Sequence, residues 1–282
     1  MLERLDAYKN LGFETPKHSK FHHYASIPFA EILLKVSRAE INGTLPNEGP
    51  AIVVANHVSL KDAFLLHLIA ILQAQRTISV FANRSRLEKG VSESEEAKAG
   101  RTQEDVGGIR RSFLRWYLNG FNPIPVDIGG TTPESRRVNM AAFKRATEEL
   151  KAGRLVGIFP QGHRKPDRDL LDMMEGITTL VKMNPDVPIY PVGFSGTDKG
   201  LVGKIKINIG EPFTYRDIPA IYRSSRVKTD ERSRIIELIA DRIAEQIEDP
   251  ALKSAWRLNR GFGWSREDIE RSKSIYPRLD ET

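Results

Sequence analysis

Short apolar runs alternate with amphipathic stretches over most of the chain. The runs have the length and the β-branched content of strands, and they lie at residues 51–55, 77–81, 123–126, 155–159, 187–192 and 204–209. Helical spacing of apolar residues separates them, at residues 60–73, 134–152, 172–182 and 229–247. Because helices that connect strands cover the faces of a sheet, this order predicts an α/β fold with a single mixed sheet flanked by helices.

The ends of the chain and one internal stretch stand outside this alternation. Apolar residues at helical spacing follow an N-cap at Ser26, which predicts an amphipathic helix that either packs on the core or lies on a membrane surface. Residues 83–111 are charged and contain almost nothing to bury, so we expect a loop, a lid or an exposed helix there. These patterns divide the chain into an N-terminal segment (1–45), an α/β domain (46–250) that contains the polar insert, and a C-terminal extension (251–282).

Composition narrows the class of protein. The 282 residues are 40% hydrophobic and 28% charged, as in an ordinary globular protein. No apolar run approaches the roughly 18–20 residues that cross a bilayer. The first residues lack the layout of a secretory signal and the chain has no cysteine, so we expect a cytoplasmic protein without disulfides. The net charge of +6 favours anionic partners such as phospholipid headgroups, coenzyme A or an acidic carrier protein. Nucleic acid is not expected, because no basic tract is interleaved with aromatic residues.

An imidazole and a carboxylate stand five positions apart after the apolar run at residues 51–55. His57 lies in the loop that ends this strand, and Asp62 lies in the first turn of the next helix. A carboxylate that holds one ring nitrogen of a histidine lets the other take a proton from a hydroxyl, so the pair predicts a general base. A second interpretation is open. Ser59 and Asp62 also fit a capping box, in which Asp62 only satisfies backbone N–H groups of the helix and His57 is an ordinary loop residue.

A second polar loop follows the apolar run at residues 155–159 and reads Gln161-Gly162-His163-Arg164. The glycine lets backbone N–H groups approach a ligand closely, and the guanidinium can bind a phosphate through a fork of donors. Functional groups gather beyond the carboxyl ends of strands in α/β sheets. We therefore expect this loop and the His57 loop to face one cleft, where one supplies a base and the other an anion clamp.

In the order and spacing of these blocks the chain resembles the glycerophospholipid acyltransferases, typified by 1-acylglycerol-3-phosphate acyltransferase. The family's Asn-His-x4-Asp block is matched at residues 56–62, with Ser59 at a commonly occupied position. Its Phe-Pro-Glu-Gly-Thr-Arg block corresponds to residues 159–164, and its Val-Pro-Ile-x-Pro-Val strand corresponds to residues 187–192. The resemblance covers roughly residues 24–250, and three ordered blocks together are far more specific than any one of them.

The resemblance implies a glycerol-phosphate acyltransferase-like fold and transfer of a fatty acyl group from a thioester to a lipid hydroxyl. It makes His57 the general base and Asp62 its orienting partner. It also implies a set of substrate-binding residues, namely Asn56, Ser59, Phe159, Pro160, Gln161, Gly162, His163, Arg164 and Pro191. No metal and no cofactor are implied apart from the co-substrate, which is acyl-CoA or acyl carrier protein. The expected partners are this donor, a lysophospholipid acceptor and an anionic membrane surface, with the enzyme peripheral on the cytoplasmic face of the membrane.

Three positions depart from the family pattern. Gln161 replaces a glutamate, His163 replaces a threonine, and Ile128 stands where the family's second block usually has an arginine. The expected acceptor is a lyso-glycerophospholipid, 1-acylglycerol-3-phosphate above all, but these departures leave two alternatives open. One is the same chemistry on another lipid acceptor, such as a glycolipid or an amino lipid. The other is a non-catalytic protein that binds lipid or carrier protein.

Overall fold

The computed structural model describes residues 28, 34–35, 38–84, 87, 122–162, 173–197, 204–218 and 231–248. Most of the N-terminal segment with its predicted amphipathic helix, most of the polar insert, and the C-terminal extension lie outside the described residues. The proposed domain boundaries therefore stay predictions.

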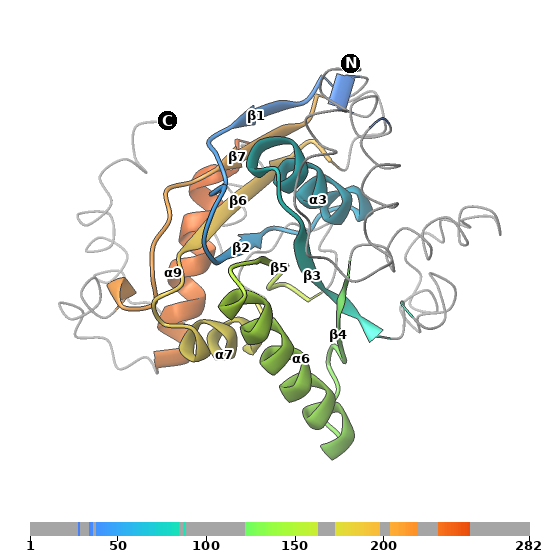
Figure 1. Ribbon diagram of the computed structural model, residues 1–282, viewed down its shortest axis with the longest axis vertical. Helices are drawn as coiled ribbons and strands as arrows, with labels where there is room; N and C mark the ends of the chain where they lie inside the picture. The colour runs from blue at the N-terminus through green and yellow to red at the C-terminus, as the bar shows by residue number, and fades with distance from the viewer. Residues whose placement is uncertain are drawn as a thin grey trace, which may run out of the picture. The chain divides into compact units, whose positions relative to one another are not determined.

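The described strands form one sheet of seven strands in the order β1-β7-β6-β2-β5-β3-β4 (Figure 1). They are β1 Glu40–Asn42, β2 Ala51–Ala55, β3 Ile78–Asn83, β4 Ile124–Val126, β5 Leu155–Ile158, β6 Ile189–Ser195 and β7 Lys206–Ile209. The named helices are α3 Leu60–Ala74, α6 Pro133–Lys151, α7 Gly176–Met183 and α9 Glu231–Gln246. The sheet is mixed because β7 is antiparallel to β6 but parallel to β1, while β3 is parallel to both β4 and β5. The predicted α/β class with one mixed sheet is confirmed.

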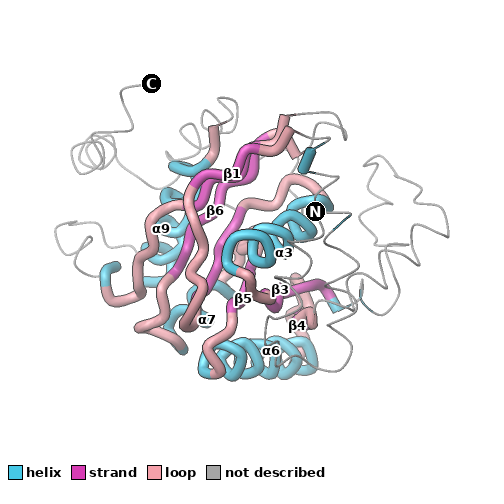
Figure 2. Tube along the Cα trace, turned by 45° about the horizontal axis from the view of Figure 1, so that its top comes forward, coloured by secondary structure: helices cyan, strands magenta, loops and turns pink. Residues whose placement is uncertain are grey.

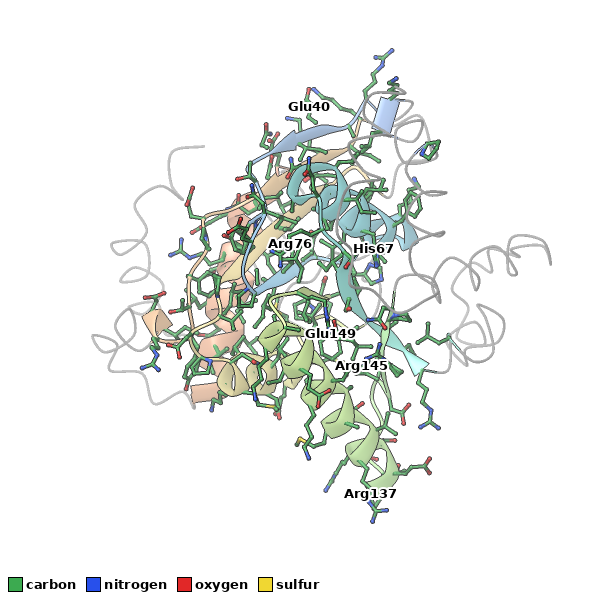
Figure 3. All side chains as sticks on the ribbon, in the orientation of Figure 1. Glu40, His67, Arg76, Arg137, Arg145 and Glu149 are labelled. Atoms are coloured by element: carbon green, nitrogen blue, oxygen red, sulfur yellow. The ribbon has the colours of Figure 1, made fainter. Side chains whose placement is uncertain are left out.

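Contacts divide the chain into two compact units, and the first consists of Met1–Lys35, Leu45–Ile52 and Ala63–Ile158. In this unit α6 packs on β4 and β5 (Figure 2). Arg76, labelled in Figure 3, follows α3 and donates to the carbonyl oxygen of Pro46 at 3.0 Å and to that of Gly153. Burial lowers the pKa of the Arg76 guanidinium, and the nearby Glu48 carboxylate opposes that shift. The Arg76 side chain thus links the segment after α3 to the segment before β2 and to the turn after α6.

The second unit consists of Val36–Thr44, Val53–Asp62 and Phe159–Thr282. Here α9 packs on β6 and β7, and α7 packs on α9. The buried face of α9 carries apolar residues three or four positions apart, which are Ile235, Leu238, Ile239 and Ile243. Gly193 in β6 permits the close approach of α9, since a Cβ atom there would lie 2.4 Å from the carbonyl carbon of Gln246.

Most element boundaries lie within two residues of those that the hydrophobic pattern predicts, and three elements differ by more. Residues 173–175 were predicted to be helical, but α7 begins only at Gly176. β1 was not predicted, because its three residues are polar or half-exposed and the strand is recognisable only through its parallel pairing with β7. β6 extends to Ser195, three residues beyond the predicted end, because Val192–Ser195 pair with β7. Within the described part of the chain, no helix has the length and apolar character needed to span a membrane.

We predict that Gly193→Ala lowers the free energy of unfolding by about 3 kcal/mol, because the added methyl group would overlap the main chain of α9. The matched control is Gly153→Ala, at a residue with φ of 74° and no atom near the added carbon. That control should cost about 1 kcal/mol, through its backbone conformation alone. Urea unfolding of both variants measures the difference. Equal losses of unfolding free energy in the two variants would show that α9 does not approach β6 closely at Gly193.

Candidate active site

The loop after β2 is fixed to β6 by one side chain. The Asn56 amide nitrogen donates to the carbonyl oxygen of Phe194 at 2.9 Å, and the Phe194 main-chain nitrogen donates to the Asn56 amide oxygen at 2.7 Å. Asn56 is 1% exposed, so the pair of bonds continues the hydrogen bonding of the sheet beyond the end of β2. These contacts anchor the loop that carries His57. Contact of Asn56 with a substrate stays a prediction.

His57 and Asp62 form the pair that their spacing predicts. Nδ1 of His57 lies 3.1 Å from Oδ2 of Asp62, and their side chains are 13% and 0% exposed. A carboxylate oxygen only accepts hydrogen bonds, so Nδ1 carries the ring proton and Nε2 keeps its lone pair. In the neutral imidazole, this geometry leaves Nε2 as the nitrogen that can take a proton.

The same carboxylate oxygen also caps helix α3. Oδ2 of Asp62 accepts from the main-chain nitrogens of Val58 and Ser59, both at 2.6 Å. The Ser59 hydroxyl oxygen accepts from the Lys61 main-chain nitrogen at 3.2 Å. The contacts that the capping interpretation requires and those that the dyad interpretation requires are thus both present, because one oxygen accepts from three donors. The positive end of the helix dipole further favours a carboxylate in this first turn.

The turn after β5 contacts His57 twice. The Phe159 ring stacks on the imidazole with ring centroids 4.4 Å apart, and the Gln161 amide oxygen accepts from the His57 main-chain nitrogen at 2.6 Å. Gly162 closes the turn by donating to the Phe159 carbonyl oxygen at 3.0 Å, and its φ of 69° suits glycine. The structure therefore places these two loops in contact, whereas the cleft that they were expected to face stays a prediction.

Three other predicted substrate-binding residues make contacts within the protein, and their contact with a substrate stays a prediction. Pro191 lies within β6, and its carbonyl oxygen accepts from the Gly210 main-chain nitrogen at 2.8 Å. Ser59 caps α3, and Pro160 accepts from the Met174 main-chain nitrogen at 2.7 Å. His163 and Arg164 lie outside the described residues, so the anion clamp stays a prediction.

Sequence reasoning missed Lys61. Its side-chain nitrogen donates to the carbonyl oxygen of Thr197 at 3.2 Å, and Thr197 is a buried residue just beyond β6. The only sequence signal was a lysine between the two motif positions Ser59 and Asp62. The contact ties the first turn of α3 to the segment just beyond β6. All these residues belong to the second unit.

Two comparisons with known proteins bear on this site. Residues 102–195 match the acyltransferase family. The chain is also 30% identical, over 137 residues, to the 1-acyl-sn-glycerol-3-phosphate acyltransferase of Bacillus subtilis (strain 168). That alignment covers 46% of this chain and 64% of the relative's length. The matches confirm the resemblance to the glycerophospholipid acyltransferase family. The family match begins after His57 and Asp62, so the roles of these two residues rest on their geometry.

We predict that Asn56→Ala lowers the free energy of unfolding by about 2–4 kcal/mol, because it leaves the buried N–H and C=O groups of Phe194 without partners. The control is Asn42→Ala, which removes an exposed bond of 2.8 Å to Asn208 and should cost less than about 1 kcal/mol. Chemical unfolding of the two variants is the measurement. A loss at Asn56 no larger than that at Asn42 would contradict the anchoring role.

Proposed function

We propose that the protein is an acyltransferase of the His-x4-Asp type, which moves a fatty acyl group from a thioester to a hydroxyl of a lyso-glycerophospholipid. The observation that carries this proposal is the contact of 3.1 Å between His57 Nδ1 and the buried Asp62 Oδ2. The family match and the Bacillus subtilis relative support the reaction class. His57 is the general base, and Asp62 is the residue that orients it.

The reaction needs one proton to move twice. Nε2 of His57 removes the proton from the acceptor hydroxyl as its oxygen attacks the thioester carbonyl carbon. A tetrahedral intermediate forms, and its collapse breaks the carbon–sulfur bond. The imidazolium returns the proton to the departing sulfur, so the products are an ester and a free thiol. The histidine ends the cycle neutral, as it began.

Asp62 contributes orientation and charge. It is fully buried, and its three hydrogen bonds all involve Oδ2, while Oδ1 has no hydrogen-bond partner in the described part of the chain. A carboxylate shielded from water stabilises a nearby positive charge more strongly than a solvated one. The imidazolium that forms during the reaction is therefore stabilised where it appears, with no need for Asp62 to take up the proton.

The proposed acceptor is 1-acylglycerol-3-phosphate, the substrate class named for the relative. The acyl donor is acyl-CoA or acyl carrier protein, and the net charge of +6 favours approach to either donor and to an anionic membrane surface. Gly162 and Arg164 are proposed to hold the acceptor's phosphate, as the family motif implies. The proposed location is peripheral, on the cytoplasmic face of the membrane.

A second acceptor class follows from Ile128, which stands where the family usually has an arginine. Loss of one cationic contact favours an acceptor with less negative charge, such as a glycolipid or an amino lipid. Mass spectrometry of the lipids formed from mixed donors and acceptors separates the two. Exclusive acylation of 1-acylglycerol-3-phosphate would eliminate the second class, and failure to acylate any lipid would leave a binding protein.

We predict that His57→Ala abolishes transfer of a labelled acyl chain, because no described group replaces the base. The variant should remain folded, since Asp62 still caps α3 through Val58 and Ser59. Transfer is followed by thin-layer chromatography of the labelled lipid, and circular dichroism confirms the fold. Normal turnover in this variant would refute the mechanism.

We predict that Asp62→Asn reduces kcat by about 10³-fold without abolishing transfer, because an amide can favour the wrong ring tautomer while the base remains present. Asp62→Ala should reduce activity and, in addition, stability by about 1 kcal/mol, since it also removes the cap. Steady-state kinetics together with urea unfolding distinguish the two effects. An Asp62→Asn variant as active as the wild type would exclude an orienting role.

A further inference from the structure

The main chain around His57 is held by side chains. Three successive N–H groups donate to side-chain oxygens, that of His57 to Gln161 and those of Val58 and Ser59 to Asp62, each at 2.6 Å. Nδ1 of the His57 ring contacts Asp62, whereas the His57 main chain is held from the loop after β5, through Gln161. The position of the imidazole therefore depends on Gln161 as well as on Asp62.

Gln161 is itself a rigid support. It is 1% exposed, and it sits in a turn closed by the bond from Gly162 to Phe159. The preceding residue, Pro160, accepts from the Met174 main-chain nitrogen at 2.7 Å, which fixes the turn from its other side. Phe159 stacks on the imidazole ring of His57, and Gln161 accepts a hydrogen bond from its main chain. The turn therefore constrains both the side chain and the main chain of His57.

We propose that Gln161 is a positioning residue, whose amide oxygen fixes the main chain of His57. This inference rests on the proposed acyl transfer and assigns Gln161 a role other than contact with the acceptor. A displacement of about 1 Å at a reacting group can cost on the order of a hundredfold in rate. We therefore expect the anchoring of the His57 main chain to affect kcat.

Two substitutions at Gln161 test this anchor. Gln161→Met keeps the length of the side chain and removes the acceptor oxygen, whereas Gln161→Glu introduces the residue of the family pattern and keeps an acceptor. We expect Gln161→Met to speed hydrogen exchange of the His57 main-chain N–H by tenfold or more and to lower kcat by about 10–100-fold, with KM within about twofold of wild type. We expect Gln161→Glu to retain slow exchange and a kcat within about threefold of wild type.

The matched control is Gln75→Met, at an exposed residue beyond the opposite end of α3 from Asp62, which should leave both the exchange of the His57 N–H and kcat unchanged. Hydrogen exchange needs no substrate, so it tests the anchor even if the protein transfers no acyl group. Unchanged exchange in Gln161→Met would overturn the anchoring role. A loss confined to KM would instead assign Gln161 to acceptor binding, and a Gln161→Glu variant as impaired as Gln161→Met would contradict a role that depends on the acceptor oxygen.

Discussion

One oxygen atom, Oδ2 of Asp62, joins the local stability of the loop to the chemistry proposed for it. It accepts the two main-chain N–H groups that precede α3 and also the ring nitrogen of His57. The same bonds that begin the helix therefore fix the ring that it carries. Because the atom is buried, these bonds are not exchanged with water, and the arrangement is set when the loop folds. Asp62 thus orients the ring, while Gln161 holds the main chain of the same residue.

The sheet explains why the other contacts converge on His57. Asn56 follows the last residue of β2, Phe194 is the last but one residue of β6, and Gln161 comes three residues after β5. Each of them makes a hydrogen bond at or next to His57. Neighbouring strands thus deliver their carboxyl ends to one place, as open α/β sheets do. The loops after β2 and β5, which lie about a hundred residues apart in the sequence, are in this way parts of one hydrogen-bonded cluster.

Much of this arrangement was predictable from the sequence, and the remainder depended on tertiary pairing. The apolar run of β2 and the helical spacing of α3 fixed where His57 and Asp62 would lie, and their spacing predicted their contact. The spacing of the residues could not decide between a dyad and a helix cap. Both functions use the same oxygen of Asp62, and the sequence does not show that this oxygen contacts all three donors. Gln161 was expected to face a substrate, and its bond to the His57 main chain joins residues 104 positions apart, which no local pattern reports. Lys61 was missed for the same reason, since its partner Thr197 is 136 positions away.

The most direct test of the central claim concerns the tautomer of one ring. In protein labelled with [15N]histidine, nitrogen–proton correlation spectra identify which ring nitrogen of neutral His57 carries the proton, and a His57→Gln variant assigns its signals. We expect the proton on Nδ1, with Nε2 unprotonated and able to act as the base. A neutral His57 that carries its proton on Nε2 would contradict the orientation by Asp62 and, with it, the proposed mechanism.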